Sequence, residues 1–205
     1  MSEQLPLAFG ENNSDLSPFI LVEENKLAYH WLERWPDWPV PTRSLNIYGP
    51  AASGKSQLAH YHQKRVSAHY LESLLSWPQN KITQKHLILD DLAVNETWSE
   101  EALFHLYQSV SEQNGSLLIL SRRPISAMDW QLPDLKSRMR SVSAQAILPL
   151  SDASVISLLE HHFALRQCVV PEQVVNYLAK RMSRDYQALQ QIVQKIDRAS
   201  LKHKL

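Results

Sequence analysis

Residues 49–56 read Gly49-Pro50-Ala51-Ala52-Ser53-Gly54-Lys55-Ser56 and match the pattern G-x-x-x-x-G-K-[ST] at every fixed position. The apolar run 44–48 precedes this stretch and a helical pattern follows it, which predicts a strand, a loop and a helix in succession. Glycines in such a loop allow backbone N–H groups to approach phosphate oxygens closely. Lys55 would supply a positive charge to the β- and γ-phosphates, and Ser56 a hydroxyl ligand for Mg²⁺. The stretch therefore predicts a nucleotide-binding loop.

The bulk composition describes a globular chain without a dominant charge. Of its 205 residues 44% are hydrophobic, which is enough for a sizeable core in one domain with a smaller appendage. Twenty-one basic and 21 acidic residues give a formal net charge of zero. This balance offers no overall attraction to nucleic acid or to an anionic membrane, so we expect any DNA association to be delegated to a partner.

Signals for disulfides, metal clusters and membrane segments are absent from the sequence. Cys168 is the single cysteine, and the nine histidines form no recognised metal-ligand spacing. No apolar run approaches about 18 residues, and the N-terminus has no basic start followed by an apolar core. We therefore expect no membrane partner and a cytoplasmic protein.

A second landmark is the apolar run 87–89, which is followed at once by Asp90 and Asp91. In a nucleotide-binding protein of this type, an acid at a strand end holds Mg²⁺, and an adjacent acid can orient or deprotonate the attacking water. We assign Asp90 to the first role and Asp91 to the second. The apolar run 117–121 ends in Ser121, whose hydroxyl could reach the γ-phosphate or its water, so Ser121 is a sensor candidate.

Apolar runs and helical patterns alternate along the chain, which favours an α/β fold with a parallel five-stranded sheet flanked by helices. The expected strands are residues 44–48, 66–71, 87–89, 117–121 and 146–148. Helical patterns at 151–166, 171–181 and 184–202 predict a small all-α lid at the C-terminal end. We therefore expect an N-terminal peptide and linker at 1–18, a nucleotide-binding α/β domain at 19–149 and the lid at 150–205.

The N-terminal hexapeptide is Gln4-Leu5-Pro6-Leu7-Ala8-Phe9, and a polar, turn-rich stretch follows it at residues 10–18. An apolar peptide on a polar tether suggests docking into a groove of another protein, with spaced apolar side chains as anchors. The residues by themselves also allow the segment to fold back onto its own core.

The ordered set of motifs resembles the AAA+ family that contains the bacterial replication initiator DnaA, and within it the Hda branch of DnaA-related regulators. The resemblance runs over essentially the whole chain and implies a P-loop AAA+ fold. The matching elements are the hexapeptide 4–9, the Walker A stretch 49–56, the acid pair 90–91, the sensor I segment 121–124, the box VII segment 132–138 and the lid start 148–152.

The resemblance also implies partners. The hexapeptide is similar to the sliding-clamp motif Q-x-x-L-x-F, which implies docking to the clamp, the β subunit of DNA polymerase III, through Gln4, Leu5, Leu7 and Phe9. Arg138 stands at the arginine-finger position of the box VII segment and would act in trans on nucleotide bound to DnaA. A solvated charge on a surface helix is the alternative for Arg138.

Two features depart from the DnaA pattern. Gln187 stands where the family's sensor II segment has an arginine, and Arg184, one helical turn earlier on the same face, is the candidate substitute. An amide cannot replace that charge, so we expect weak or no intrinsic ATPase activity. The sequence ends at Leu205, where the third lid helix ends, so we expect no helix-turn-helix domain and no direct sequence-specific DNA binding.

The resemblance implies an ADP- or ATP-binding regulator with Mg²⁺, docked on the clamp, that inhibits replication initiation by promoting hydrolysis of DnaA-bound ATP. An adaptor or loader that recruits DnaA or another replication protein without stimulating hydrolysis is the alternative, and a self-sufficient ATPase or kinase is a further rival. The sequence leaves open the resident nucleotide, the clamp affinity, self-association into a homo-oligomer and whether the partner is DnaA itself. The expected nucleotide contacts are Gly49, Pro50, Ala51, Ala52, Ser53, Gly54, Lys55, Ser56, Gln57, Asp90 and Arg184.

Overall fold

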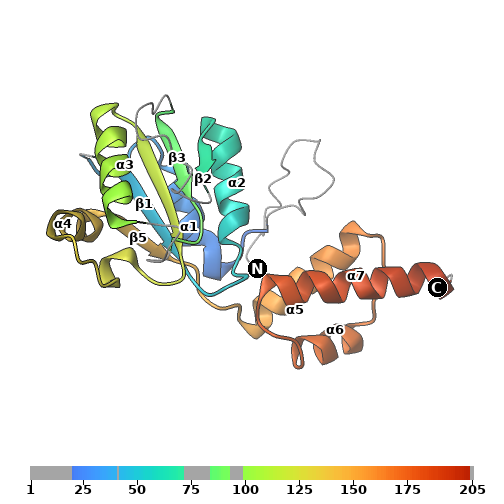
Figure 1. The fold of residues 1–205 in the computed structure, drawn as a ribbon. Coiled ribbons are helices and arrows are strands. Elements are labelled where there is room, and N and C mark those ends of the chain that lie inside the picture. Colours follow the sequence, from blue (N-terminus) through green and yellow to red (C-terminus); the bar gives the residue numbers. More distant parts are fainter. Residues whose placement is uncertain (1–19, 41, 72–83, 93–98, 204–205) are drawn as a thin grey trace.

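A computed structural model describes residues 20–40, 42–71, 84–92 and 99–203 of the chain (Figure 1). The hexapeptide 4–9 and the linker 10–18 lie outside the described residues. None of the described helices is both long and apolar enough to cross a membrane.

Within the described residues, the first part of the chain builds a parallel sheet of five strands in the order β2-β3-β4-β1-β5. The strands are β1 (Arg43–Tyr48), β2 (His69–Leu71), β3 (His86–Leu89), β4 (Ser116–Ser121) and β5 (Ser143–Ala146). Helices α1 (Glu23–Glu33), α2 (Lys55–Val66), α3 (Glu100–Glu112) and α4 (Pro133–Ser141), with the 3₁₀ turn η1 (Ile125–Ala127), surround it. The predicted α/β fold with a five-stranded parallel sheet is therefore confirmed.

The central strand β4 explains why helices cover both faces of the sheet. All of its residues are buried, and successive side chains point to opposite faces. Leu117 and Ile119 pack into a core with α3 and α4, whereas Leu118 and Leu120 pack into a second core with α1 and α2. Figure 1 shows the two helical layers on either side of the strands.

Two predicted strands differ from the observed ones. Residue 66 was expected in a strand, but α2 continues through Val66 and ends where Ser67 takes a left-handed conformation with φ 52°. The last strand was expected at 146–148, but β5 is the polar run 143–146 at the sheet edge. An edge strand is held by backbone pairing to one neighbour, so it needs no apolar run.

Helices α5 (Asp152–Leu165), α6 (Glu172–Ala179) and α7 (Tyr186–His203) form the lid around a third core. Ile20 and Val22, which precede α1, pack into this core as well. The buried Asn25 side chain fixes this entry segment, because it donates to the Ile20 carbonyl at 3.0 Å and to the Tyr186 hydroxyl at 2.9 Å, and accepts from Val22 N at 3.0 Å. The start of the described chain is therefore attached to the lid.

Glu24 on α1 makes a second attachment. Its carboxylate accepts hydrogen bonds from Ser151 N at 2.9 Å and from the Ser154 hydroxyl at 2.7 Å, at the N-terminus of α5. Burial acts to raise the pKa of Glu24, but these hydrogen bonds outweigh it and hold the pKa below its usual value. The charged carboxylate also suits the positive end of the α5 dipole.

Two buried histidines make the stability of the fold depend on pH. His62 on α2 stacks on the Trp38 ring with centroids 5.0 Å apart, and His162 is buried on α5. Burial lowers the pKa of each imidazole from 6.5 to about 4. An unfolded histidine binds its proton at higher pH than these buried ones, so acidification from 6.5 towards 4 favours the unfolded chain.

We predict that the free energy of unfolding falls as the pH is lowered from about 6.5 to 4, with each buried histidine contributing up to about 3 kcal/mol of the loss. Urea unfolding at a series of pH values measures this slope. His162→Gln should flatten it, whereas His105→Gln, at an exposed histidine, should not. An equally steep slope in both variants contradicts the assignment to His162.

Candidate nucleotide-binding site

The loop between β1 and α2 has the backbone that its glycines predict. Gly54 has φ +90°, and Ala52 is also left-handed with φ 55°. A Cβ atom at Gly49 would lie 2.6 Å from the carbonyl oxygen of Ile147, so a side chain there would force the loop away from the end of β5. The loop thus closes tightly over the N-terminus of α2, where free N–H groups and the helix dipole favour an anion.

Lys55 points into this loop. Its Nζ atom donates to the Gly49 carbonyl at 2.9 Å, to the Pro50 carbonyl at 2.7 Å and to the Ser53 hydroxyl at 3.4 Å. Burial lowers the pKa of the Lys55 ammonium, and the charges of Asp90 and Asp91 oppose this effect. A buried ammonium inside a glycine loop at a helix N-terminus fits the phosphates of a nucleotide.

The structure brings together the two residues predicted to hold Mg²⁺. The Ser56 hydroxyl donates to Asp90 Oδ2 at 3.1 Å, although the two residues come from α2 and the end of β3. The Tyr70 hydroxyl donates to the same carboxylate oxygen, and Asp91 N donates to Asp90 Oδ1 at 2.8 Å. A hydroxyl and a carboxylate beside the loop are oxygen ligands of the kind that Mg²⁺ prefers.

Asp91 faces Arg122, a cation for which the sequence alone predicted no contact with the acid pair. Its backbone is left-handed with φ 48°, and its Oδ1 and Oδ2 atoms lie 3.4 and 3.5 Å from Nε and Nη2 of Arg122. Arg122 directly follows β4, which pairs with β3 in parallel. Because neighbouring parallel strands end at the same edge of a sheet, this position could have been predicted to face the acid pair.

The Ser121 hydroxyl is fully buried at the end of β4. It donates to the Arg123 carbonyl at 2.7 Å and accepts from the Asn46 amide at 2.9 Å. The Asn46 side-chain oxygen in turn accepts from Ile125 N at 3.1 Å. The hydroxyl therefore faces this network rather than the loop, and the sensor role proposed for it stays a prediction.

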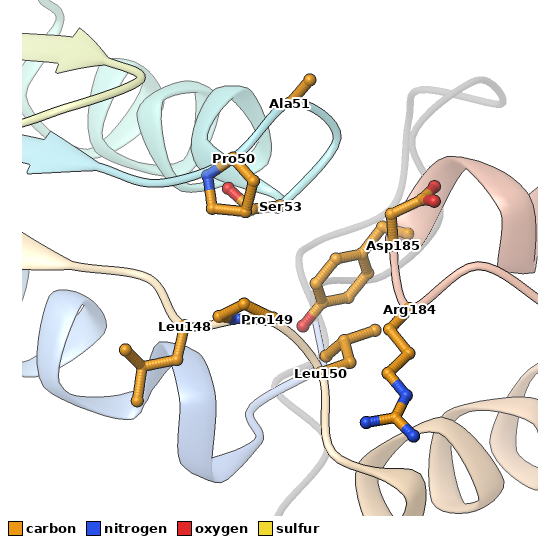
Figure 2. A pocket seen from close by; sticks show the side chains of 9 residues that line it. Pro50, Ala51, Ser53, Leu148, Pro149, Leu150, Arg184 and Asp185 are labelled. Atoms are coloured by element: carbon orange, nitrogen blue, oxygen red, sulfur yellow. The ribbon is translucent and has the colours of Figure 1, made fainter.

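A cavity of about 340 Å³ separates the loop from the lid (Figure 2). This volume is in the range of small-molecule sites. Tyr186 closes one side of the cavity, because its N–H donates to the Ala52 carbonyl at 3.0 Å and its ring lies 3.5 Å from where a Gly54 Cβ would be. The lining residues are Pro50, Ala51, Ser53, Leu148, Pro149, Leu150, Arg184, Asp185 and Tyr186.

Arg184 and Gln187, the two sensor II candidates, differ in their position relative to the cavity. Arg184 lines the cavity, but its guanidinium pairs with Asp152 at 2.9 Å and points away from the loop residues (Figure 2). Gln187 is exposed in the first turn of α7 and is not among the lining residues. Between them, Asp185 caps α7 by accepting from Ala188 N at 2.7 Å.

Arg138 lies away from this cavity. It sits on α4, with its guanidinium carbon 4.8 Å from the Phe104 ring centre and 5.5 Å from that of Tyr107. Helix α4 is on the side of the sheet domain opposite the lid (Figure 1). Such cation–π contacts hold a guanidinium without neutralising it.

Comparison with known proteins identifies the lid. Residues 152–205 match the family model described as "Hda, lid domain". The lid is therefore similar to the lid domain of the Hda family. This match covers the three helices α5, α6 and α7 and follows the α/β domain that carries the loop.

The fold as a whole is similar to DnaA structures. DnaA bound to AMPPCP and single-stranded DNA is 18% identical with a TM-score of 0.70, and the match covers 91% of this chain and 66% of that chain. Domain III of DnaA from Thermotoga maritima is 19% identical with a TM-score of 0.74, covering 91% and 88%. The ORC2 protein of Aeropyrum pernix is 15% identical with a TM-score of 0.62, covering 89% and 62%.

These similarities show the AAA+ fold, and the chain spans just under two thirds of the first DnaA chain. Together with the match to the Hda lid model they confirm the predicted fold class. Two of the similar DnaA structures, one of them from Aquifex aeolicus, contain bound AMPPCP.

We predict that Lys55→Ala weakens ADP binding by at least about tenfold, because the variant lacks the ammonium that would meet the phosphates. Isothermal titration calorimetry measures this affinity. Lys64→Ala, which removes an exposed charge at the other end of α2, is the matched control and should bind ADP like the unmodified chain. Equal affinities for all three proteins would show that the loop does not bind the phosphates.

Proposed function

We propose that this chain is a sliding-clamp-docked AAA+ regulator that inhibits replication initiation by promoting hydrolysis of DnaA-bound ATP. The observation that carries the proposal is an Hda lid on a DnaA-like AAA+ fold. The clamp and DnaA are the proposed partners, and Arg138 is the residue proposed to act on DnaA.

The position of Arg138 supports action in trans. It lies on α4, on the side of the sheet domain opposite the lid, while the nucleotide cavity lies between the loop and the lid. Its charge rests on two aromatic rings and lacks an acidic partner among the described salt bridges. A guanidinium held in this way is available to stabilise the charge that develops when phosphate is transferred in a neighbouring subunit.

The chain's own nucleotide site would serve mainly for binding. Lys55 and the loop would hold the phosphates, and Ser56 with Asp90 would hold Mg²⁺, which supplies charge neutralisation when bound. Hydrolysis by the chain itself would be weak, because Gln187 is exposed and Arg184 pairs with Asp152. Resident ADP or ATP would then stabilise the closed arrangement of loop and lid.

Docking on the clamp would concentrate the regulator where DNA is being replicated. The hexapeptide with Gln4, Leu5, Leu7 and Phe9 would supply the contact, and residues 10–18 would be the tether. Joining a clamp-binding peptide to a AAA+ domain makes the encounter with DnaA on the same DNA an effectively intramolecular event.

We predict that Arg138→Ala lowers the stimulation of DnaA ATP hydrolysis by about a thousandfold, in the range measured for arginine fingers supplied in trans. Single-turnover hydrolysis of ATP preloaded on DnaA, in the presence of DNA-loaded clamp, measures the effect. Arg140→Ala, an exposed charge on the same helix, is the matched control and should retain stimulation.

Unchanged stimulation with Arg138→Ala would overturn the role of this arginine. No stimulation by the unmodified chain, with DnaA binding intact, would instead favour the adaptor that recruits DnaA without activating it.

We predict that deletion of residues 1–9 abolishes binding to the sliding clamp, because the spaced side chains that would fill the groove are lost. Calorimetric titration of the clamp with the full chain and with the deletion variant measures this. Asn12→Ala in the linker is the control and should bind normally. Clamp binding that survives the deletion would place the contact elsewhere in the chain.

A further inference from the structure

The Asp90 carboxylate is held on both of its oxygen atoms. Asp91 N donates to Oδ1 at 2.8 Å, and the hydroxyls of Ser56 and Tyr70 both donate to Oδ2. Hydrogen bonds to a charged carboxylate are among the stronger ones in proteins. A carboxylate can accept about four hydrogen bonds, so three donors fix its orientation and leave about one direction open.

The register of the sheet brings Tyr70 to this carboxylate. Tyr70 lies on the edge strand β2, opposite Ile88 of β3. Asp90 follows Ile88 by two residues, and its N–H donates to the Leu71 carbonyl at 3.2 Å. Side chains two positions apart on a strand point to the same face. Ile88 and Tyr70 pack into the core that contains α2, so Asp90 is directed to the side of the sheet that carries Ser56.

The imidazole of His60 supports the Tyr70 ring from α2. The two rings stack with centroids 5.1 Å apart and an interplanar angle of 24°. The Nδ1 atom of His60 lies 2.6 Å from the carbonyl oxygen of Ser56, one helical turn earlier. Because a carbonyl oxygen can only accept, Nδ1–H is the donor. His60 therefore joins Tyr70 to the backbone of Ser56.

We propose that Tyr70 is a positioning residue for the candidate Mg²⁺ site and that His60 supports it. The Tyr70 hydroxyl holds Asp90 Oδ2 beside the Ser56 hydroxyl, so the two expected oxygen ligands stay together. Removal of a group that orients a metal ligand costs about 10- to 100-fold in metal affinity or activity. Neither residue lies in the motifs 49–56 or 90–91, and the sequence alone gave neither of them a role.

This inference rests on the nucleotide site of the proposed function, and ADP binding with Mg²⁺ and with EDTA in its place tests it. Calorimetry measures both affinities for the full chain, for Tyr70→Phe and for the control Tyr177→Phe, at an exposed tyrosine of the lid. Tyr70→Phe should reduce the gain in ADP affinity that Mg²⁺ gives by about tenfold. Its ADP affinity in EDTA should change by less than about twofold, and Tyr177→Phe should leave both affinities unchanged.

Two further variants test whether Tyr70 acts through Asp90. Asp90→Asn should remove the gain from Mg²⁺, and Tyr70→Phe added to it should have no further effect, because the carboxylate that the hydroxyl positions is gone. His60→Ala, which removes the stacked ring, should give a smaller loss than Tyr70→Phe in the same direction. A full further loss in the double variant contradicts action through Asp90, and an unchanged gain in His60→Ala contradicts the supporting role.

An unchanged gain in Tyr70→Phe overturns the inference. Equal losses with Mg²⁺ and with EDTA also overturn it, because they describe a residue that only stabilises the fold. A larger gain overturns it as well, since the hydroxyl would then compete with the metal for Oδ2. ADP binding by the unmodified chain that is independent of Mg²⁺ overturns the metal site while the Lys55-dependent site stands, and no ADP binding overturns both.

Discussion

The parallel pairing of β1, β3 and β4 brings the ends of three strands to one edge of the sheet, and the candidate phosphate site depends on this edge. Two backbone hydrogen bonds hold it together, from Gly49 N to the Ser121 carbonyl and from Leu92 N to the Leu120 carbonyl. The loop, the acid pair and Arg122 each follow one of these strands. Residues more than 30 positions apart in the chain thereby contact one another, as Ser56 and Asp90 do.

The sequence predicted the parts of this site that local chemistry specifies. A loop that encloses phosphate needs Gly49 and Gly54 at set positions, and the structure shows why, through the contact with Ile147 and the positive φ. Asp90 could be predicted because a buried apolar strand leads directly to it. The edge strand β5 was misplaced because Ser143-Ala144-Gln145-Ala146 has no apolar periodicity and is held by backbone bonds to β1.

Contacts across long stretches of chain could not be read from the sequence in the same way. Glu24 and Asn25 look like ordinary polar residues of a first helical turn, yet both are buried and bind groups at the start of α5 and α7. Their roles depend on where α1 packs, and no spacing in the sequence encodes that. The contacts of the Ser121 hydroxyl with the Asn46 amide and the Arg123 carbonyl are likewise long-range or loop contacts that no spacing predicts.

The Asn25 network also has a mechanical consequence. Ile20 and Val22 lie in the core of the lid, and Asn25 joins their backbone to the hydroxyl of Tyr186, whose N–H holds the phosphate loop. A force applied to the chain on the N-terminal side of Ile20 would therefore act first on the lid and on the contact of Tyr186 with the loop, and only then on the strands of the sheet. The junction of entry segment, lid and loop therefore lies between the N-terminal side of the chain and the sheet in the path of such a force.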